Sequence, residues 1–189
     1  MKKGKLFVIS GSSGVGKGTM VSAILERNPE IKLSISTTTR PPRPNEENGV
    51  NYFFITKEEF QEQIKNENFF EWAEFADNFY GTSKKFLEDS INQGQSIILE
   101  IDVQGAFQVK EKCKEAILIF ILPPSMEELK NRLTNRKTET SDIINKRMSL
   151  AEKEFAQKDK FDYQIINNEL EKAIIELENI INLERGIKC

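Results

Sequence analysis

Histidine is absent from this 189-residue sequence, and cysteine occurs only at Cys113 and Cys189. Without imidazole, every catalytic triad or zinc site that depends on histidine is excluded. The two cysteines are far apart and form no C-x-x-C pair, a usage typical of a reducing compartment. Long apolar runs are also lacking: residues 116–122 form the longest, against roughly 20 for a membrane span, and residues 6–9 are too few for a secretory signal. We therefore expect a cytoplasmic protein without membrane association.

Charge of one sign is not in excess either. The chain has 30 acidic and 27 basic residues, a formal net charge of −3. A nearly balanced charge gives no general attraction to nucleic acid, so we expect no nucleic-acid partner. Any anion that the protein binds must therefore be held by a local cluster of basic groups.

Apolar segments of strand length are present and alternate with helical segments. Residues 5–10, 96–101 and 117–122 are almost continuously apolar, which is typical of strands buried on both faces of a parallel sheet. Each precedes a helical candidate, and a fourth unit joins a strand at 163–166 to an amphipathic helix. This repetition predicts an α/β doubly wound fold. The expected helices span residues 15–26, 103–112, 125–136 and 169–183.

Two segments interrupt this alternation. Residues 36–82 are rich in threonine, proline and aromatic residues, with strand-like pieces at 51–55 and 69–75 and a helix that begins after Thr56. This composition predicts an α+β insertion. The other segment, residues 133–148, is polar and contains several arginines and lysines.

A glycine-rich loop follows the first expected strand and leads into the first expected helix, as a phosphate-binding P-loop requires. Its glycines allow successive backbone N–H groups to converge on a phosphate, while Lys17 adds a full positive charge. Gly18 stands where the pattern has Ser or Thr, so we expect Mg²⁺ to be coordinated either indirectly or through the hydroxyl of Thr19. These residues predict ATP binding. The loop consists of Gly11, Ser12, Ser13, Gly14, Val15, Gly16, Lys17, Gly18 and Thr19.

The insertion distinguishes among P-loop proteins. Arg40 and Arg43 lie three positions apart on a proline-rich segment, which suits capture of a second phosphate. The interpretation as a GTPase has some support from Asp102-Val-Gln-Gly105. However, the Asn-Lys-x-Asp sequence with which GTPases recognise guanine is missing. A mechanochemical ATPase would need a larger core. A small phosphotransferase therefore fits best.

Further motifs give the chain a resemblance to a known family. Tyr52 lies in Gly49-Val-Asn-Tyr-Phe-Phe54, Glu71 in Phe70-Glu-Trp-Ala73, and Asp102 in Glu100-Ile-Asp-Val-Gln-Gly105, with Tyr80-Gly-Thr82 between them. Together with the P-loop, these motifs resemble guanylate kinases over residues 6–183. The resemblance implies a three-layer P-loop core with a parallel central sheet (1–35, 83–125 and 149–189), a GMP-binding region (36–82) and a helical lid (126–148).

The same resemblance assigns functional residues and implies that Mg²⁺ accompanies ATP. Glu71 is the expected specificity residue, because one carboxylate can accept both the N1–H and the 2-amino group of guanine, whereas adenine offers no such donor pair. The catalytic set implied is Lys17, Arg40, Arg132, Arg136 and Arg147. The GMP-binding set implied is Ser36, Arg40, Arg43, Tyr52, Glu71, Tyr80, Thr82 and Asp102.

Simpler interpretations stay open at this point. The lid arginines would suit a solvated helix face, the tyrosines would suit a core, and alternation along a strand would turn Glu71 outward. Asp102 would also serve as a helix N-cap. For the whole chain, the alternatives are a guanylate-kinase-like protein-interaction module or another nucleoside monophosphate kinase, and the sequence leaves the oligomeric state undetermined.

Overall fold

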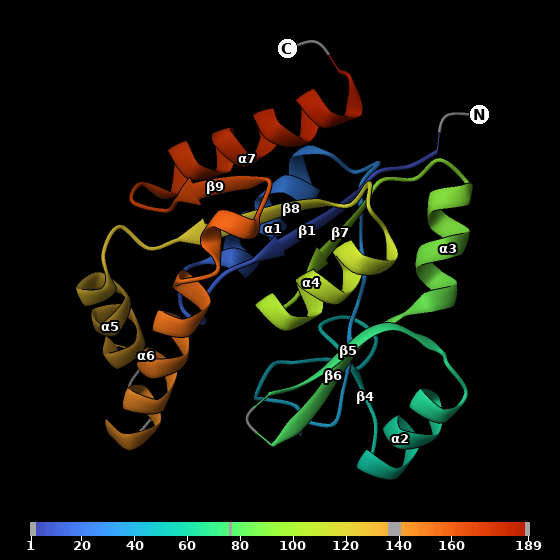
Figure 1. Cartoon of the computed structure of the whole chain (residues 1–189), viewed down its shortest axis with the longest axis horizontal. Helices are drawn as coiled ribbons and strands as arrows, with labels where there is room; N and C mark the ends of the chain where they lie inside the picture. The colour runs from blue at the N-terminus through green and yellow to red at the C-terminus, as the bar shows by residue number, and fades with distance from the viewer. Residues whose placement is uncertain (1–2, 76, 136–140, 188–189) are drawn as a thin grey trace.

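The computed structural model describes residues 3–75, 77–135 and 141–187, and for residues 141–143 it describes the backbone only. The chain forms two lobes (Figure 1). The larger lobe, the core, is built on a five-stranded sheet in the order β2-β7-β1-β8-β9, in which every neighbouring pair is parallel. Its strands are β1 (Leu6–Ser10), β2 (Lys32–Leu33), β7 (Ile97–Glu100), β8 (Ile117–Leu122) and β9 (Tyr163–Ile166).

Helices cover both faces of this sheet, because alternate residues of each buried strand point to opposite sides. Phe7 and Ile9 of β1 pack in one apolar cluster with α1 and α7, whereas Leu6 and Val8 pack in another with α3 and α4. The result is three layers, as expected. Outside the small lobe the helices are α1 (Lys17–Arg27), α3 (Lys84–Asn92), α4 (Val103–Lys112), α5 (Met126–Asn135), α6 (Ser141–Phe155), the 3₁₀ turn η1 (Lys158–Lys160) and α7 (Leu170–Arg185).

The smaller lobe is the insertion. It contains a four-stranded mixed sheet in the order β4-β3-β6-β5, and one helix, α2, which opens with the expected capping box of Thr56 and Glu59. Phe60 of α2 stacks on Phe69 and Phe79, which fixes the helix against the sheet. The elements are β3 (Thr37–Thr38), β4 (Phe53–Phe54), α2 (Lys57–Lys65), β5 (Phe69–Phe75) and β6 (Asn78–Ser83).

The α/β fold with a parallel central sheet is confirmed, with differences at some element ends. The first helix begins at Lys17 rather than at residue 15, because Gly16 (φ 99°) still belongs to the left-handed loop. The expected strand at 51–55 shortens to Phe53–Phe54 because residues 47–51 form a turn. The helices α3 and α6 and the strand β6 had no clear signal in the sequence.

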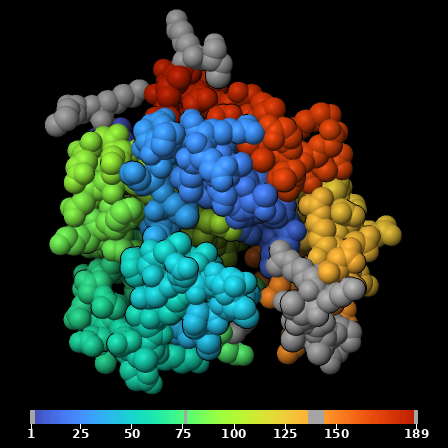
Figure 2. All heavy atoms as spheres, turned by 180° about the vertical axis from the view of Figure 1, so that it is seen from behind, coloured from blue at the N-terminus to red at the C-terminus, as the bar shows by residue number. Residues whose placement is uncertain are grey.

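The two lobes face each other across a recess, which Figure 2 shows from behind. In Figure 1, α5 and α6 project from the same side of the core as the small lobe and stand across from it, so they form the second wall of the opening. Among the described residues, no helix has the length and apolar character that crossing a membrane requires.

Candidate active site

The P-loop connects β1 to α1 and has the positive-φ backbone that its glycines allow. Gly11, Gly14 and Gly16 all have positive φ, with 99° at Gly16. A Cβ atom at Gly16 would lie 2.5 Å from the amide nitrogen of Asn167, whose side chain is buried and donates to the carbonyl of Val15 at 2.7 Å. Only glycine satisfies both the backbone angle and this close approach. Asn167, at the end of β9, therefore holds the loop from behind.

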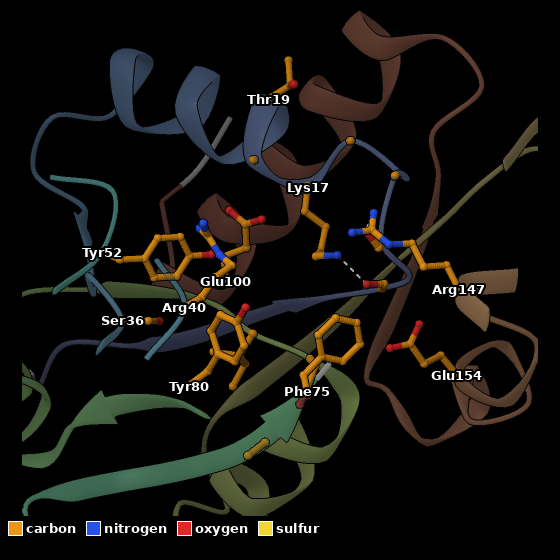
Figure 3. Close-up of a pocket in the computed structure, with 18 of the residues that line it drawn as sticks. Lys17, Thr19, Ser36, Arg40, Tyr52, Phe75, Tyr80, Glu100, Arg147 and Glu154 are labelled. Carbon is orange, nitrogen blue, oxygen red and sulfur yellow. Dashed lines mark hydrogen bonds between the residues drawn. The ribbon is translucent and has the colours of Figure 1, made fainter. Parts of the chain in front are cut away.

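Lys17 lies across the mouth of the loop. Its ammonium donates to the backbone carbonyls of Gly11 and Ser12, the latter at 3.2 Å. Figure 3 shows the side chain directed into the cavity between the lobes. The positive charge and the converging loop therefore face the same space, which suits a phosphate group.

Arg40 forms the corresponding cationic group on the small lobe. Its Nη2 donates to both carboxylate oxygens of Glu46 at 2.9 Å, and its Nη1 donates to the carbonyl of Pro41 at 2.7 Å. The guanidinium also lies 5.4 Å from the ring centre of Tyr52 and 5.9 Å from that of Phe54. Although burial opposes ionisation of Glu46, bonds from the Arg43 backbone and the Arg40 guanidinium lower its pKa. The carboxylate of Glu46 thus fixes a charged Arg40 in one orientation.

Glu71 is buried, with 3% of the residue exposed, while its neighbour Trp72 on β5 is 38% exposed. The side chain therefore points inward, and the interpretation that strand alternation turns it to solvent is wrong. Its Oε1 accepts a hydrogen bond from the Thr82 hydroxyl at 2.5 Å. Burial raises the pKa of Glu71 to about 7; the bond from Thr82 opposes this rise, and the nearby Asp102 carboxylate adds to it.

Two more carboxylates stand at the carboxyl end of β7. Asp102 caps α4 through the backbone N–H of Gly105 at 2.8 Å and also lines the cavity, so its capping role and a ligand role are compatible. Glu100 lies beside the start of α1, with its oxygens 3.6 and 3.7 Å from where a Cβ of Gly18 would be. Burial raises the pKa of Glu100, and the Lys17 charge opposes that rise.

Helix α6 brings two more charged groups to the P-loop. Arg147 donates to the Ser13 hydroxyl at 3.3 Å, and Glu154 is buried near Ser12 and Lys17. Arg132 of α5 behaves differently, because it pairs with Glu128 at 3.0 Å and donates to the Asn167 carbonyl at 3.1 Å. In this structure Arg132 supports the wall behind the P-loop.

These groups surround one cavity of about 410 Å³. Figure 3 shows Lys17 and Arg147 on one side of it, with Arg40, Tyr52 and Tyr80 on the other. Most of the residues expected from the sequence meet here. They are Gly11, Ser13, Gly14, Gly16, Lys17, Gly18, Thr19, Ser36, Arg40, Arg43, Tyr52, Glu71, Tyr80, Asp102 and Arg147.

A few of the expected residues do not line the cavity. Ser12 and Val15 are buried in the loop itself, Thr82 reaches the cavity only through Glu71, and Arg132 makes the contacts described above. Arg136 lies outside the described residues. Thr19, the expected Mg²⁺ ligand, is at the rim, and Figure 3 shows its side chain pointing away from Lys17.

Other cavity residues were not among the expected ones. Glu100 sits two positions before Asp102 in an assigned motif, so its place at the end of a buried strand was a usable signal. Glu154 and Phe75 gave no signal in the sequence, because only the tertiary fold brings the ends of α6 and β5 to the cavity. Ala73 and Ile101 complete the unexpected lining, and Glu46 was missed as the partner of Arg40.

A P-loop that faces a second anchored cationic group across one cavity defines a P-loop phosphotransferase with sites for two phosphorylated substrates. The guanylate kinase family model matches residues 3–184. The chain is 50% identical to the guanylate kinase of Clostridioides difficile (strain 630), over 98% of this chain and 91% of that protein. It is 48% identical to the guanylate kinase of Synechococcus sp. (strain JA-3-3Ab), over 95% of this chain and 82% of that protein. The crystal structure of guanylate kinase from Anaplasma phagocytophilum is similar as well, with a TM-score of 0.82 and 35% identity over 97% of this chain and 87% of that one. The chain belongs to the guanylate kinase family and is a nucleoside monophosphate kinase.

Proposed function

We propose that this chain transfers the γ-phosphoryl group of ATP to GMP, and also to dGMP, to give ADP and GDP or dGDP. One observation carries the proposal: the buried carboxylate of Glu71 opens into the cavity that also contains the P-loop and Arg40. Burying a carboxylate without a charged partner is costly, so such a site suits a ligand that supplies hydrogen-bond donors.

Guanine is the base that meets this requirement. Its N1–H and 2-amino groups point in the same direction and would donate to Glu71, with Asp102, Ser36 and Thr82 around the ring. Adenine has a bare N1 at this position and would leave the carboxylate unpaired. A mismatch of this kind supports discrimination on the order of 10⁴-fold.

The phosphate of GMP would lie against the second cationic group. Arg40 and Arg43 line this side of the cavity together with Tyr52 and Tyr80, whose rings are 6.1 Å apart. The GMP phosphate is itself the nucleophile, and its second pKa of about 6 leaves it largely dianionic at neutral pH. The reaction therefore needs alignment and neutralisation of charge rather than a general base, which agrees with the absence of histidine.

ATP would occupy the P-loop, with its phosphates between Lys17 and Arg147. Mg²⁺ is commonly held by one or two carboxylates together with substrate phosphates. Glu100 fits this need, because its partly buried carboxylate faces the start of α1. Thr19 is at the same end of the helix, but its side chain points away from Lys17 (Figure 3). When bound, the ion neutralises charge on the transferring phosphoryl group. Arg132 and Arg136 complete the proposed ATP-side cations.

We further assign residues 36–82 as the GMP-binding region, residues 126–148 as the lid and the rest as the core. Because water competes for the phosphoryl group, the GMP-binding region and the lid are expected to close before transfer. Small-angle scattering tests this closure, and the radius of gyration should fall when GMP and a non-hydrolysable ATP analogue are added together. An unchanged radius would remove the closure from the proposal.

An ADP-release assay tests the function. Purified protein with ATP and Mg²⁺ is offered GMP, dGMP, AMP, UMP or CMP in turn. We expect release with GMP and dGMP and little with the others. Preference for AMP would indicate another nucleoside monophosphate kinase, and the absence of GMP-dependent release would favour a protein-interaction module.

A further inference from the structure

The outer edge of β5 is covered by side chains of a helix from the other lobe. β5 is the last strand of the small sheet, so one edge of its backbone has no neighbouring strand. The side-chain amide of Gln108 on α4 occupies this edge at Trp72: its Nε2 donates to the Trp72 carbonyl at 2.7 Å, and its Oε1 accepts from the Trp72 N–H at 3.3 Å. The amide thus pairs with the strand as another backbone would.

A second side chain of α4 makes the same kind of contact one turn further on. The ammonium of Lys112 donates to the Phe70 carbonyl at 2.6 Å. The Phe70 carbonyl and the Trp72 backbone therefore both face this edge, although the pairing of β5 with β6 shifts register between Phe69 and Glu71. Gln108 and Lys112 are four positions apart and lie on one face of the helix. Two donors on one helix face therefore fix two consecutive outward-facing positions of the strand.

Glu71 lies between these two fixed positions, and the same helix also limits its carboxylate. A Cβ atom at Gly105 would lie 2.6 Å from Oε2 of Glu71, so the carboxylate packs directly against the first turn of α4. The opposite oxygen accepts from Thr82. The backbone on each side of Glu71 and both of its oxygens are thus held, three of these four constraints coming from α4.

From this arrangement we infer that Gln108 and Lys112 are positioning residues for base selectivity in the proposed GMP site. The inference rests on the proposed function, since it concerns how Glu71 meets guanine. For one carboxylate to accept hydrogen bonds from two parallel donors, its position and angle must be fixed. When the backbone at residues 70 and 72 is released, Glu71 keeps its charge but loses that alignment.

Lys112 also favours guanine through its charge, which affects the protonation of Glu71. Its positive charge lowers the pKa of Glu71, against the effect of burial. The lysine thus favours the ionised carboxylate, the form that accepts both guanine donors. Gln108 is uncharged, so substitutions at residues 108 and 112 separate alignment from charge.

The test compares GMP with inosine monophosphate, which lacks the 2-amino group and so reports the second hydrogen bond to Glu71. Gln108→Met keeps the length of the side chain but removes both bonds, and Gln108→Glu removes only the N–H donor. Lys112→Met removes the other donor, whereas Lys112→Arg retains one. Glu111→Gln, at an exposed position of the same helix, is the matched control.

We expect Gln108→Met and Lys112→Met each to lower the ratio of kcat/KM for GMP to that for inosine monophosphate by about tenfold, as the loss of roughly one net hydrogen bond implies. KM for ATP should stay unchanged, Lys112→Arg should restore the ratio, and Glu111→Gln should match the wild type. Hydrogen exchange of the Trp72 amide should quicken in Gln108→Met, which removes its acceptor, but not in Gln108→Glu, which keeps one. This reports the broken pairing without any turnover.

Three results would contradict the positioning role of Gln108 and Lys112 or the function on which it rests. If the melting temperature of the Gln108 variants falls but the substrate ratio stays at the wild-type value, Gln108 is only structural and the inference is overturned. An unchanged rate of Trp72 amide exchange in Gln108→Met overturns it as well. If the wild-type enzyme shows no GMP-dependent turnover, the proposed function fails first and this inference fails with it.

Discussion

The two ends of the cavity are built by different means. At the core end, one continuous segment, residues 11–19, supplies a glycine-rich loop and a single lysine, and it leads directly into α1. At the small-lobe end, the groups are side chains from separate segments, such as Arg40, Tyr52, Glu71 and Tyr80, each held by its own partner. The first site is a local property of the chain, whereas the second exists only once the lobe has folded.

The cations at the two ends differ in the same way. Lys17 is a compact ammonium that rests on backbone carbonyls of its own loop. Arg40 is a planar guanidinium held by the Glu46 carboxylate and the aromatic rings of Tyr52 and Phe54. A point charge suits a phosphoryl group that moves during reaction, and an oriented fork suits a phosphate that must stay in place. The comparison predicts that loss of the Lys17 charge lowers kcat most, and that loss of the Arg40 orientation raises KM for GMP most.

The largest effect is expected from Lys17→Met. Removing the charge that faces the transferring phosphoryl group should lower kcat by about 10⁴-fold, with little change in the melting temperature. Steady-state ADP release at saturating GMP measures this. Lys32→Met, on an exposed position of the core, is the control. A fall of less than tenfold would mean that Lys17 is not the main cation of the ATP side.

The second effect concerns selectivity at the other end. Glu71→Gln keeps one acceptor for guanine but places an amide where the 2-amino group must donate, and that amide can also donate to N1 of adenine. We expect the preference for GMP over AMP in kcat/KM to fall by about a hundredfold, with KM for ATP unchanged. Glu74→Gln, exposed on the same strand, should behave as wild type. Equal selectivity in the two variants would show that another group reads the base.

This difference between the two ends also explains what the sequence could reveal. The P-loop could be located from the sequence because its strand, glycines, lysine and helix follow one another directly, although the helix begins at Lys17 rather than at residue 15. The alternation of strands and helices gave the α/β core. Glu71 was found through resemblance to a family, while alternation along β5 pointed the wrong way. Partners such as Glu46 and Gln108 gave no signal, since each acts on a residue that only folding brings near.

The third effect tests the anchoring of Arg40. Glu46→Gln keeps the shape of the side chain but removes the charge that holds the guanidinium through two hydrogen bonds. KM for GMP should rise by about tenfold, and kcat should change much less. Glu47→Gln, at the exposed neighbouring position, is the control. If kcat fell as much as kcat/KM, Arg40 would contribute to the transition state and the contrast with Lys17 would disappear.

The smallest effect is a pH dependence confined to the GMP end. Because burial raises the pKa of Glu71 from 4.5 to about 7, the folded protein without substrate holds a proton there that the unfolded chain releases above about pH 4.5. The raised pKa therefore contributes stability that is fully present below pH 4.5 and is lost as pH rises through 7.

Guanine, however, needs the ionised carboxylate, so binding and stability change in opposite directions with pH. Between pH 6.5 and 8 the ionised fraction rises about fourfold, and KM for GMP should fall by about the same factor. The GMP phosphate, with a second pKa of about 6, changes charge only slightly over this range. KM for GMP in Glu71→Gln should vary little with pH, and KM for ATP should be constant in both proteins. If the wild type and Glu71→Gln gave parallel profiles, the titrating group would lie elsewhere, and the chemical difference between the two ends would not extend to protonation.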